Sequence, residues 1–432
     1  MKNSNLKRFM ASLLAVVMIF SVVGISPAVF AEGADAATQS IAVQASKEST
    51  KVVLKEGVSI AYNMNADEMI KDIIANVVDM DASTLPADVT AADFTVKKMV
   101  GIGIASAPFD FADSNGRPKD DAGDTPRIRV TYNGNDTYKS SKADVEITIV
   151  KGTVNVSVNP INKIYAGKEI DRSTVYTLNP NDPEIDVYMF FVGVNTNKET
   201  CVYLKLSADQ EKLINAISDA QTAWNDFWNV KDGVTLKEKL QKGIKVKELR
   251  EILNNIATSD VAMGIIKLAG YDADAVKAII EALDRVASIS DDTVLAIGTP
   301  AHAGVYTLTA VAVGKNYETT DATGSLVVLK NWKGIKLAKN PVLSSNAKAN
   351  TITVSQAEAL KEGNNLCILT ENGTPLNSAS AGSIRYWFTG VGKIYAKSTM
   401  PTAPGKYIVT ASVSGGDFFA FPYTFTFTIV AD

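Results

Sequence analysis

The sequence predicts a mainly β chain of three tandem β-sandwich units, with a small helical bundle interrupting the second unit and one short helix in the first. A similar strand pair occurs three times, at residues 125–150, 300–329 and 402–430. Between the first two copies, at residues 207–288, apolar residues at helical spacing replace the alternation typical of strands. A strand pair that recurs at the end of each unit predicts three units in a row.

The strand pair of the second unit shows the pattern most clearly. Tyr306, Leu308 and Ala310 fall on one face of its first strand, and Thr307 and Thr309 fall on the other. Alternation of this kind between glycine-bearing turns predicts a half-buried strand.

The spacing of the three copies identifies the helical stretch as an insertion. We predict the units at residues 40–150 (unit one), 151–330 (unit two) and 331–432 (unit three). The equivalent threonines Thr131, Thr309 and Thr410 are 178 and 101 residues apart, and the excess of 77 matches the 82 residues of the helical stretch. A separate helical domain is the alternative, but it would leave residues 291–329 as a lone hairpin, which is not stable by itself.

Helix signals occur in unit one and in the insertion. Asn65 with Glu68, Ser207 with Gln210, and Thr235 with Glu238 each have the spacing of a capping box. The apolar residues at helical spacing are Met69, Ile70, Ile73, Ile74, Val77 and Val78 in unit one, and Leu213, Ile217, Ala220, Trp224, Phe227, Val246, Leu249, Ile252, Leu253, Ile256, Val276, Ile279, Ile280, Leu283 and Val286 in the insertion. Several short amphipathic helices in succession predict a small bundle.

The N-terminus has the pattern of a secretory signal peptide. Lys2, Lys7 and Arg8 precede an apolar run at residues 9–23, and small residues end the segment at Ala31, where we predict cleavage. A membrane anchor is the alternative, but the run is shorter than the roughly 20 residues that a span needs. We therefore expect an extracellular protein, either secreted or held at the cell wall.

Charge limits the classes of partner. The formal net charge is −4, and removal of the predicted signal peptide makes it −7. The sequence contains no Lys/Arg cluster or basic stripe, which argues against nucleic acid. Neither a cofactor motif nor a transmembrane segment is predicted in the mature chain.

The closing motif carries a family resemblance. A turn of the form Pro-x-x-x-Gly-x-Tyr-x-x-Thr-Ala occurs as PAHAGVYTLTA at residues 300–310 and as PTAPGKYIVTA at residues 401–411, and residues 132–150 of unit one are related to it. These segments resemble the last strand pair of bacterial Ig-like repeats of exported and cell-surface proteins. The resemblance covers the β portions of all three units and implies an Ig-like sandwich and an extracellular location. It implies no activity, because such sandwiches carry many functions.

Histidine and cysteine chemistry is poorly represented. The only histidine, His302, lies in the turn before a strand, where we interpret it as an ordinary turn residue rather than a catalytic base. Cys201 and Cys367 fall in different units, and Cys367 lies in an apolar run typical of a core position. We expect neither a zinc site nor a disulfide framework.

Carboxylates in one loop of unit one are the candidates for calcium. The polar loop at residues 110–124 contains Asp113, Asn115, Asp120, Asp121 and Asp124. Oxygen-rich loops can bind calcium, but the spacing of a calcium loop with its terminal Glu is absent, so a solvated acidic loop is the simpler interpretation. We therefore predict no metal site.

Three tryptophans are the candidates for ligand binding. Trp224 and Trp228 lie on one predicted helix of the insertion, where core packing competes with a binding role. Trp332 lies at the junction of units two and three. Alternation at the C-terminus places Phe421, Tyr423, Phe425 and Phe427 on one face, which we expect to form the core of unit three.

These observations favour a non-enzymatic modular protein that binds a glycan or a protein, for example in adhesion, with the insertion as the place for the grafted function. A structural spacer of a cell-envelope assembly is the alternative. A carboxylate-dependent hydrolase is a third possibility, which would need two inward carboxylates in a cleft.

Overall fold

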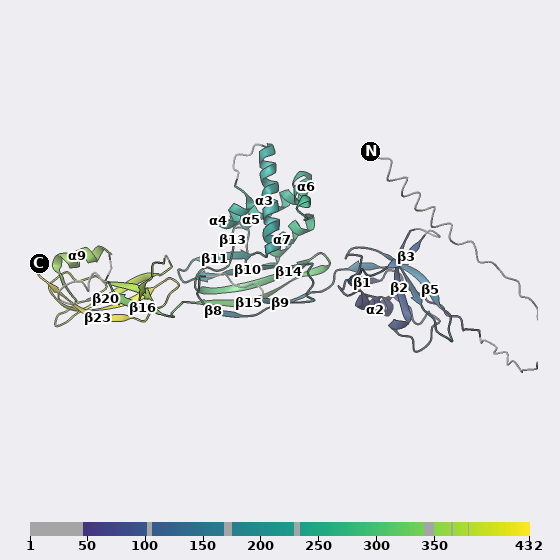
Figure 1. The fold of residues 1–432 in the computed structure, drawn as a ribbon, viewed down its shortest axis with the longest axis horizontal. Helices are drawn as coiled ribbons and strands as arrows, with labels where there is room; N and C mark the ends of the chain where they lie inside the picture. Colours follow the sequence, from purple (N-terminus) through teal and green to yellow (C-terminus); the bar gives the residue numbers. More distant parts are fainter. Residues whose placement is uncertain are drawn as a thin grey trace, which may run out of the picture. The chain divides into compact units, whose positions relative to one another are not determined.

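The computed structural model describes residues 46–101, 106–167, 175–228, 234–340, 350–363, 366–378 and 380–432, with backbone alone at 224–228 and 361–363 (Figure 1). The predicted signal peptide and its cleavage site at Ala31 lie outside these residues. Residues Glu48–Asp432, which include units two and three and unit one from Glu48 on, form one compact body. Within the described ranges the predicted fold class is confirmed: the chain is mainly β, with two sheets in each of three tandem Ig-like units.

Unit one contains a four-stranded sheet, a parallel strand pair and one α-helix. The elements are β1 (Ser59–Ala61), α2 (Ala66–Val77), the 3-10 turn η1 (Ala91–Asp93), β2 (Phe94–Val100), β3 (Ala107–Asp110), β4 (Arg127–Tyr132), β5 (Ser141–Glu146) and β6 (Thr148–Val150). The sheet order is β3-β2-β4-β5, and β1 pairs with β6. The predicted capping box of α2 is wrong: Asn65 caps the backbone N–H of Asp67 instead, and Glu68 pairs with Lys71 at 2.7 Å.

Unit two contains a seven-stranded sheet of order β12-β13-β11-β10-β14-β15-β8 and a strand pair β7-β9. The strands are β7 (Asn155–Val158), β8 (Ile161–Ile164), β9 (Tyr176–Asn179), β10 (Ile185–Asn195), β11 (Thr200–Lys205), β12 (Ile244–Lys245), β13 (Val294–Ile297), β14 (Gly304–Gly314) and β15 (Tyr317–Leu329). The short strand β12, which the sequence pattern does not predict, lies within the insertion and pairs with β13. The insertion is thus joined to the sheet by backbone pairing as well as by packing.

The insertion consists of five helices in the described residues, and the first two of them begin at the predicted capping boxes. The five helices are α3 (Ala208–Trp228), α4 (Leu236–Lys242), α5 (Val246–Thr258), α6 (Asp260–Leu268) and α7 (Ala273–Arg285). The capping boxes at Ser207 with Gln210 and at Thr235 with Glu238 are both confirmed. Each box supplies a partner for backbone N–H groups that a helix start leaves unpaired.

The helices cover the outer face of the seven-stranded sheet (Figure 1). Tyr188 and Phe190 of β10 and Val311 of β14 belong to the same apolar cluster as the helices, while the alternate residues Met189 and Phe191 belong to the sandwich core. Both faces of these strands are therefore buried. The predicted alternation of β14 holds only at its beginning, because a covered outer face needs apolar residues as well.

Unit three consists of a three-stranded and a five-stranded sheet. The elements are β16 (Ile335–Lys339), β17 (Thr351–Thr353), α9 (Val354–Gly363), β18 (Cys367–Glu371), β19 (Thr374–Pro375), β20 (Ser383–Gly390), β21 (Ala396–Lys397), β22 (Gly405–Ser414) and β23 (Tyr423–Val430), with sheet orders β16-β18-β19 and β17-β23-β22-β20-β21. The sequence pattern does not predict the helix α9. Phe425 and Phe427 are buried as expected, but Phe421 is 79% exposed because it precedes the first residue of β23.

The repeated closing motif has the same tertiary contact in units two and three. The hydroxyl of Tyr306 donates to the carbonyl of His302 at 2.9 Å, and the hydroxyl of Tyr407 donates to the carbonyl of Ala403 at 2.8 Å. Both tyrosines are buried, so the hydrogen bond satisfies a hydroxyl that would otherwise be costly in the core. Units two and three therefore share a structural motif as well as a sequence pattern.

Candidate binding site

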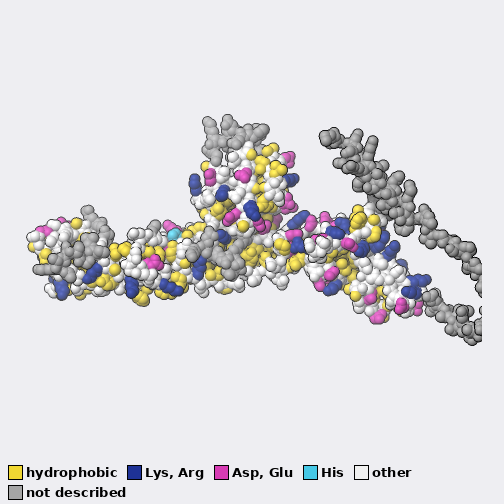
Figure 2. Space-filling view, viewed as in Figure 1, with side chains coloured by type: hydrophobic (Ala, Val, Ile, Leu, Met, Phe, Trp, Pro, Cys, Tyr) yellow, Lys and Arg dark blue, Asp and Glu magenta, His cyan; other side chains and the backbone are white. Residues whose placement is uncertain are grey.

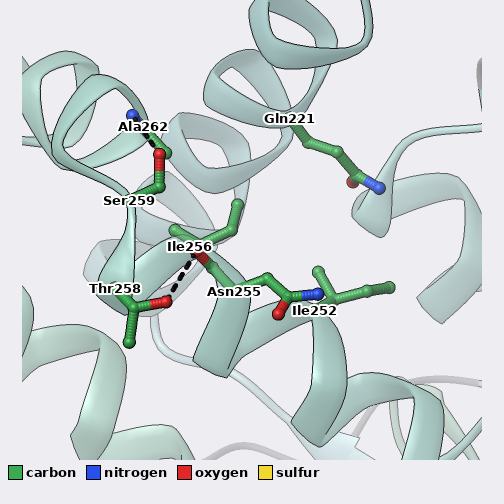
Figure 3. A pocket seen from close by; sticks show the side chains of 7 residues that line it. All are labelled: Gln221, Ile252, Asn255, Ile256, Thr258, Ser259 and Ala262. Atoms are coloured by element: carbon green, nitrogen blue, oxygen red, sulfur yellow. Dashed lines mark hydrogen bonds between the residues drawn. The ribbon is translucent and has the colours of Figure 1, made fainter. Parts of the chain in front are cut away.

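The insertion contains a hollow of about 470 Å³ between α3, α5 and α6 (Figure 3). Its volume lies within the roughly 300–1,000 Å³ typical of ligand sites. The lining residues are Gln221, Ile252, Asn255, Ile256, Thr258, Ser259 and Ala262. Each belongs to the insertion, so the hollow is absent from the parts that the three units share.

A one-residue connection between two helices shapes the hollow. Ser259 ends α5 and begins α6 with an extended backbone, at φ −94° and ψ 116°. Its hydroxyl accepts from the N–H of Ala262 at 3.2 Å, which caps α6. Thr258 donates back to the carbonyl of Asn254 at 2.9 Å. The chain changes direction at Ser259, and the hollow lies between α5, α6 and the neighbouring helix α3.

The hollow has an apolar floor and a neutral polar rim. Ile256 and Ala262 are buried in the floor. Gln221 and Asn255 extend their amides from α3 and α5, on different sides of the hollow (Figure 3), and Gln221 accepts from the N–H of Leu236 at 2.8 Å. The lining side chains that the structure describes carry no charge, so they can hold apolar groups and satisfy neutral donors and acceptors.

The predicted tryptophan candidates are not part of the described lining. The side chains of Trp224 and Trp228 lie outside the described residues. Trp332 is 45% exposed and follows Asn331, whose backbone forms a bridge with Phe418 of unit three. Asn331 and Phe418 both belong to unit three, so this bridge fixes the backbone beside Trp332 within that unit.

Four of the five calcium candidates, Asp113, Asp120, Asp121 and Asp124, contact protein groups, although Oδ2 of Asp120 is buried without a hydrogen-bond partner in the described part of the chain. Asp113 accepts from the backbone N–H groups of Asn115 at 2.8 Å and of Arg117 at 2.9 Å. Asp120 pairs with Lys98, Asp121 with Lys315, and Asp124 accepts from the N–H of Asp121 at 2.8 Å. Among the described residues, no three His, Cys, Asp or Glu are placed to hold a metal ion.

Carboxylates do line a second hollow, of about 380 Å³, between α7 and the sandwich of unit two. These side chains are solvent-exposed and have structural partners. Asp272 caps α7 through the N–H of Ala275, and Glu281 accepts from Thr319 at 3.0 Å. Such carboxylates are hydrated at the surface and are used as a helix cap and a side-chain acceptor, rather than facing each other in a closed cleft.

His302 is more than a turn residue, because it contacts a buried carboxylate of unit three. Its Nδ1 lies 2.8 Å from Oδ2 of Asp417, and the other carboxylate oxygen accepts from the N–H of Ala303 at 2.6 Å. Asp417 is completely buried. Asp417 carries no signal in the sequence pattern, because it follows Gly415 and Gly416 in a segment typical of an ordinary turn.

Comparisons with known proteins concern the fold. No protein-family model matches the chain, and no curated protein matches it. A tetra-tandem repeat from the extending region of a large adhesion protein is similar at 9% identity and TM-score 0.29, covering 89% of this chain and 74% of its own. Immunoglobulin domains 1–5 of Sidekick-1 are similar at 7% identity and TM-score 0.20, covering 88% and 58%. At such TM-scores these likenesses carry no argument about function.

No described helix is both long and apolar enough to cross a membrane.

Proposed function

We propose that this protein is a non-enzymatic extracellular binding protein, related to bacterial Ig-like repeat proteins, whose helical insertion binds a segment of a protein partner. The predicted signal peptide supports the location, and the repeated closing motif supports the relationship. One observation carries the binding role: the hollow between α3, α5 and α6 belongs to the one large element that distinguishes unit two from unit three.

The lining favours a protein segment as the ligand. Its apolar floor can receive an aliphatic or aromatic side chain, and the amides of Gln221 and Asn255 can pair with a peptide backbone. A glycan would also find amide partners.

The experiment compares two neighbouring substitutions in the full mature chain. Asn255→Lys places a long cation in the hollow, whereas Asn254→Lys places the same cation on the same helix outside the lining. Both asparagines are exposed, so neither change should unfold the protein. We expect the wild type and Asn254→Lys to bind immobilised cell-surface extract equally, and Asn255→Lys to bind at least tenfold more weakly.

Treatment of the extract identifies the class of ligand. Protease digestion should abolish binding, and periodate oxidation of the glycans should leave it unchanged. Equal binding by both variants would exclude the hollow as the site. Deletion of the whole insertion is a poor control, because it would expose Tyr188, Phe190 and Val311 on the sheet.

A structural spacer is the second candidate, and the hydrogen-bonded junctions between units favour it. Asp417 binds unit two through His302 and Ala303, and Arg117 of unit one binds Asp182 and Glu184 of unit two. A spacer would show no saturable binding to any extract, with or without the substitutions.

A further inference from the structure

The outer face of the five-stranded sheet in unit three carries an exposed tryptophan, which lines a hollow on that face. Trp387 lies in the middle of β20 and is 52% exposed. The hollow has a volume of about 620 Å³, and it is lined by Ile384, Arg385, Tyr386, Trp387, Ser398, Thr410 and Ser412. An exposed indole that borders a hollow of this size offers a flat aromatic surface to a ligand.

The equivalent position in unit two is covered. Trp387 pairs with Thr410 across β20 and β22, and Phe190 pairs with Thr309 across β10 and β14. Since Thr309 and Thr410 hold the same place in the closing motif, Phe190 and Trp387 are equivalent. Phe190 is completely buried under the insertion. Unit three has no such insertion in its described residues, so the face that packs helices in unit two is open there.

The open sheet face of unit three carries polar side chains around Trp387. Arg385 lies two residues before Trp387, so both side chains project from the same face of β20. Within the described residues, no carboxylate pairs with Arg385 or lines the hollow. The hydroxyls of Thr410 and Ser412 lie on the neighbouring strand, opposite Trp387 and Arg385. The face thus combines a flat aromatic, an uncompensated guanidinium and neutral hydroxyls.

The charge of unit three is complementary to an anion. Residues 331–432 contain nine Lys and Arg against five Asp and Glu, a formal charge of +4, whereas the rest of the chain carries −8. One of the five carboxylates, Asp417, is buried against His302 and is not displayed to solvent. An anionic ligand would therefore be attracted to this unit rather than to the rest of the protein.

We propose that the outer face of the five-stranded sheet binds an acidic glycan that contains uronic acid residues. A pyranose ring stacks its C–H face on the indole of Trp387, and the carboxylate of a uronic acid accepts two hydrogen bonds from the planar fork of Arg385. The hydroxyls of Thr410, Ser412 and Ser398 pair with ring hydroxyls. The hollow lies open on a sheet face, which suits a polymer passing across it. This site is separate from the proposed protein-binding hollow of the insertion.

The test uses the full mature chain and polymers that separate charge from sugar chemistry. The probes are polygalacturonate and hyaluronate, which carry uronic acids; fully methyl-esterified polygalacturonate, which keeps the rings and loses the charge; and polyglutamate, which keeps carboxylates without rings. Affinity is measured by titration calorimetry at fixed salt, because screening changes ionic contacts. We expect binding to at least one of the two polyuronates, and at least tenfold weaker binding to the methyl ester and to polyglutamate.

Substitutions assign the binding to this face. Arg385→Gln and Trp387→Ala should each weaken polyuronate binding at least tenfold, and Arg385→Lys should restore it only in part, since an ammonium lacks the planar fork. Arg285→Gln and Trp332→Ala, which lie outside the hollow, are the matched controls and should bind as the wild type does.

Three results would overturn the proposal: binding to neither polyuronate, equal binding to polyglutamate, or unchanged binding by both Arg385→Gln and Trp387→Ala. None of them bears on the insertion, whose own test uses Asn255→Lys.

Discussion

Asp417 shows how much a single side chain contributes at the junction of units two and three. Its carboxylate accepts from the N–H of Ala303 and contacts Nδ1 of His302. The preceding residue, Gly416, has a positive φ of 60°, and a Cβ there would lie 2.4 Å from the backbone nitrogen of Gly382. Glycine is therefore required for the turn that delivers Asp417 to unit two.

The first prediction concerns this carboxylate. Asp417→Asn should lower the free energy of unfolding by about 1–3 kcal/mol, because a buried charge-assisted contact is lost and an amide N–H₂ is left facing His302 or Ala303. Denaturant unfolding of the two proteins measures the difference. Asp321→Asn, on the exposed surface of β15, is the matched control and should change nothing measurable. A similar effect of both substitutions would refute the role assigned to Asp417.

The second prediction concerns the cysteines, which are both free. Burial raises the pKa of the Cys367 thiol to about 12, so Cys367 has almost no reactive thiolate at pH 8. Cys201 is only partly buried. Iodoacetamide should therefore alkylate Cys201 at least tenfold faster than Cys367 in the native protein, as peptide mass spectrometry would show. A Cys201–Cys367 disulfide in the mature protein would contradict the structure.

At the scale of elements, β10 and β14 decide how the insertion is attached. Their residues alternate between two apolar environments, with Met189 and Phe191 in the sandwich core and Tyr188 and Phe190 under the helices. The run from Val187 to Val192 is accordingly apolar throughout. In β20 the corresponding run has Arg385 and Trp387 on its outer face, as expected for a strand that packs on one side only.

The third prediction compares the equivalent positions Phe190 and Trp387. Phe190→Ala should destabilise the protein by about 3–5 kcal/mol, since it leaves a cavity between sheet and helices. Trp387→Ala should change the free energy of unfolding by less than about 1 kcal/mol, because the Trp387 side chain is half exposed. Denaturant unfolding gives both values. If the two substitutions cost the same, the insertion does not share a core with the sheet.

At the scale of the whole molecule, polar clusters connect successive units of the compact part at 48–432. Between units one and two, Arg117 donates to Asp182 and to Glu184, both at 2.8 Å, and Tyr317 donates to Asp182 at 2.8 Å. The side chain of Asp182 is completely buried. Burial raises the pKa of Tyr317, so the Tyr317 hydroxyl stays protonated and can donate to Asp182. The rings of Tyr62 and Tyr317 meet edge to face beside this cluster.

The fourth prediction concerns this connection. Arg117→Gln should lower the free energy of unfolding by about 3 kcal/mol, the low end of the range for removing one partner of a buried ion pair. The low end applies because Tyr317 still donates a hydrogen bond to Asp182. Calorimetry should show unit one unfolding at a lower temperature and separately from unit two. Arg285→Gln on α7 is the control and should leave the unfolding profile unchanged. A single unshifted transition in Arg117→Gln would mean that the cluster does not couple the two units.

Local patterns in the sequence predicted much of the fold and little of the candidate sites. The closing motif and the capping boxes at Ser207 and Thr235 are encoded within a few residues, so periodicity and spacing reveal them. The hollow between α3, α5 and α6 depends on how three helices pack, and the exposure of Trp387 depends on whether anything covers its strand. Neither property is local.

The sequence by itself determined the strand periods, the starts of α3 and α4 and the recurrence of the closing motif, because each depends on neighbours along the chain. Only the tertiary structure decided that the insertion shares a core with the sheet, that Asp417 meets His302 across 115 residues, and that Phe190 is covered where Trp387 is open. Such contacts depend on loop closure and face-to-face packing between distant segments, and a pattern of neighbours cannot specify them.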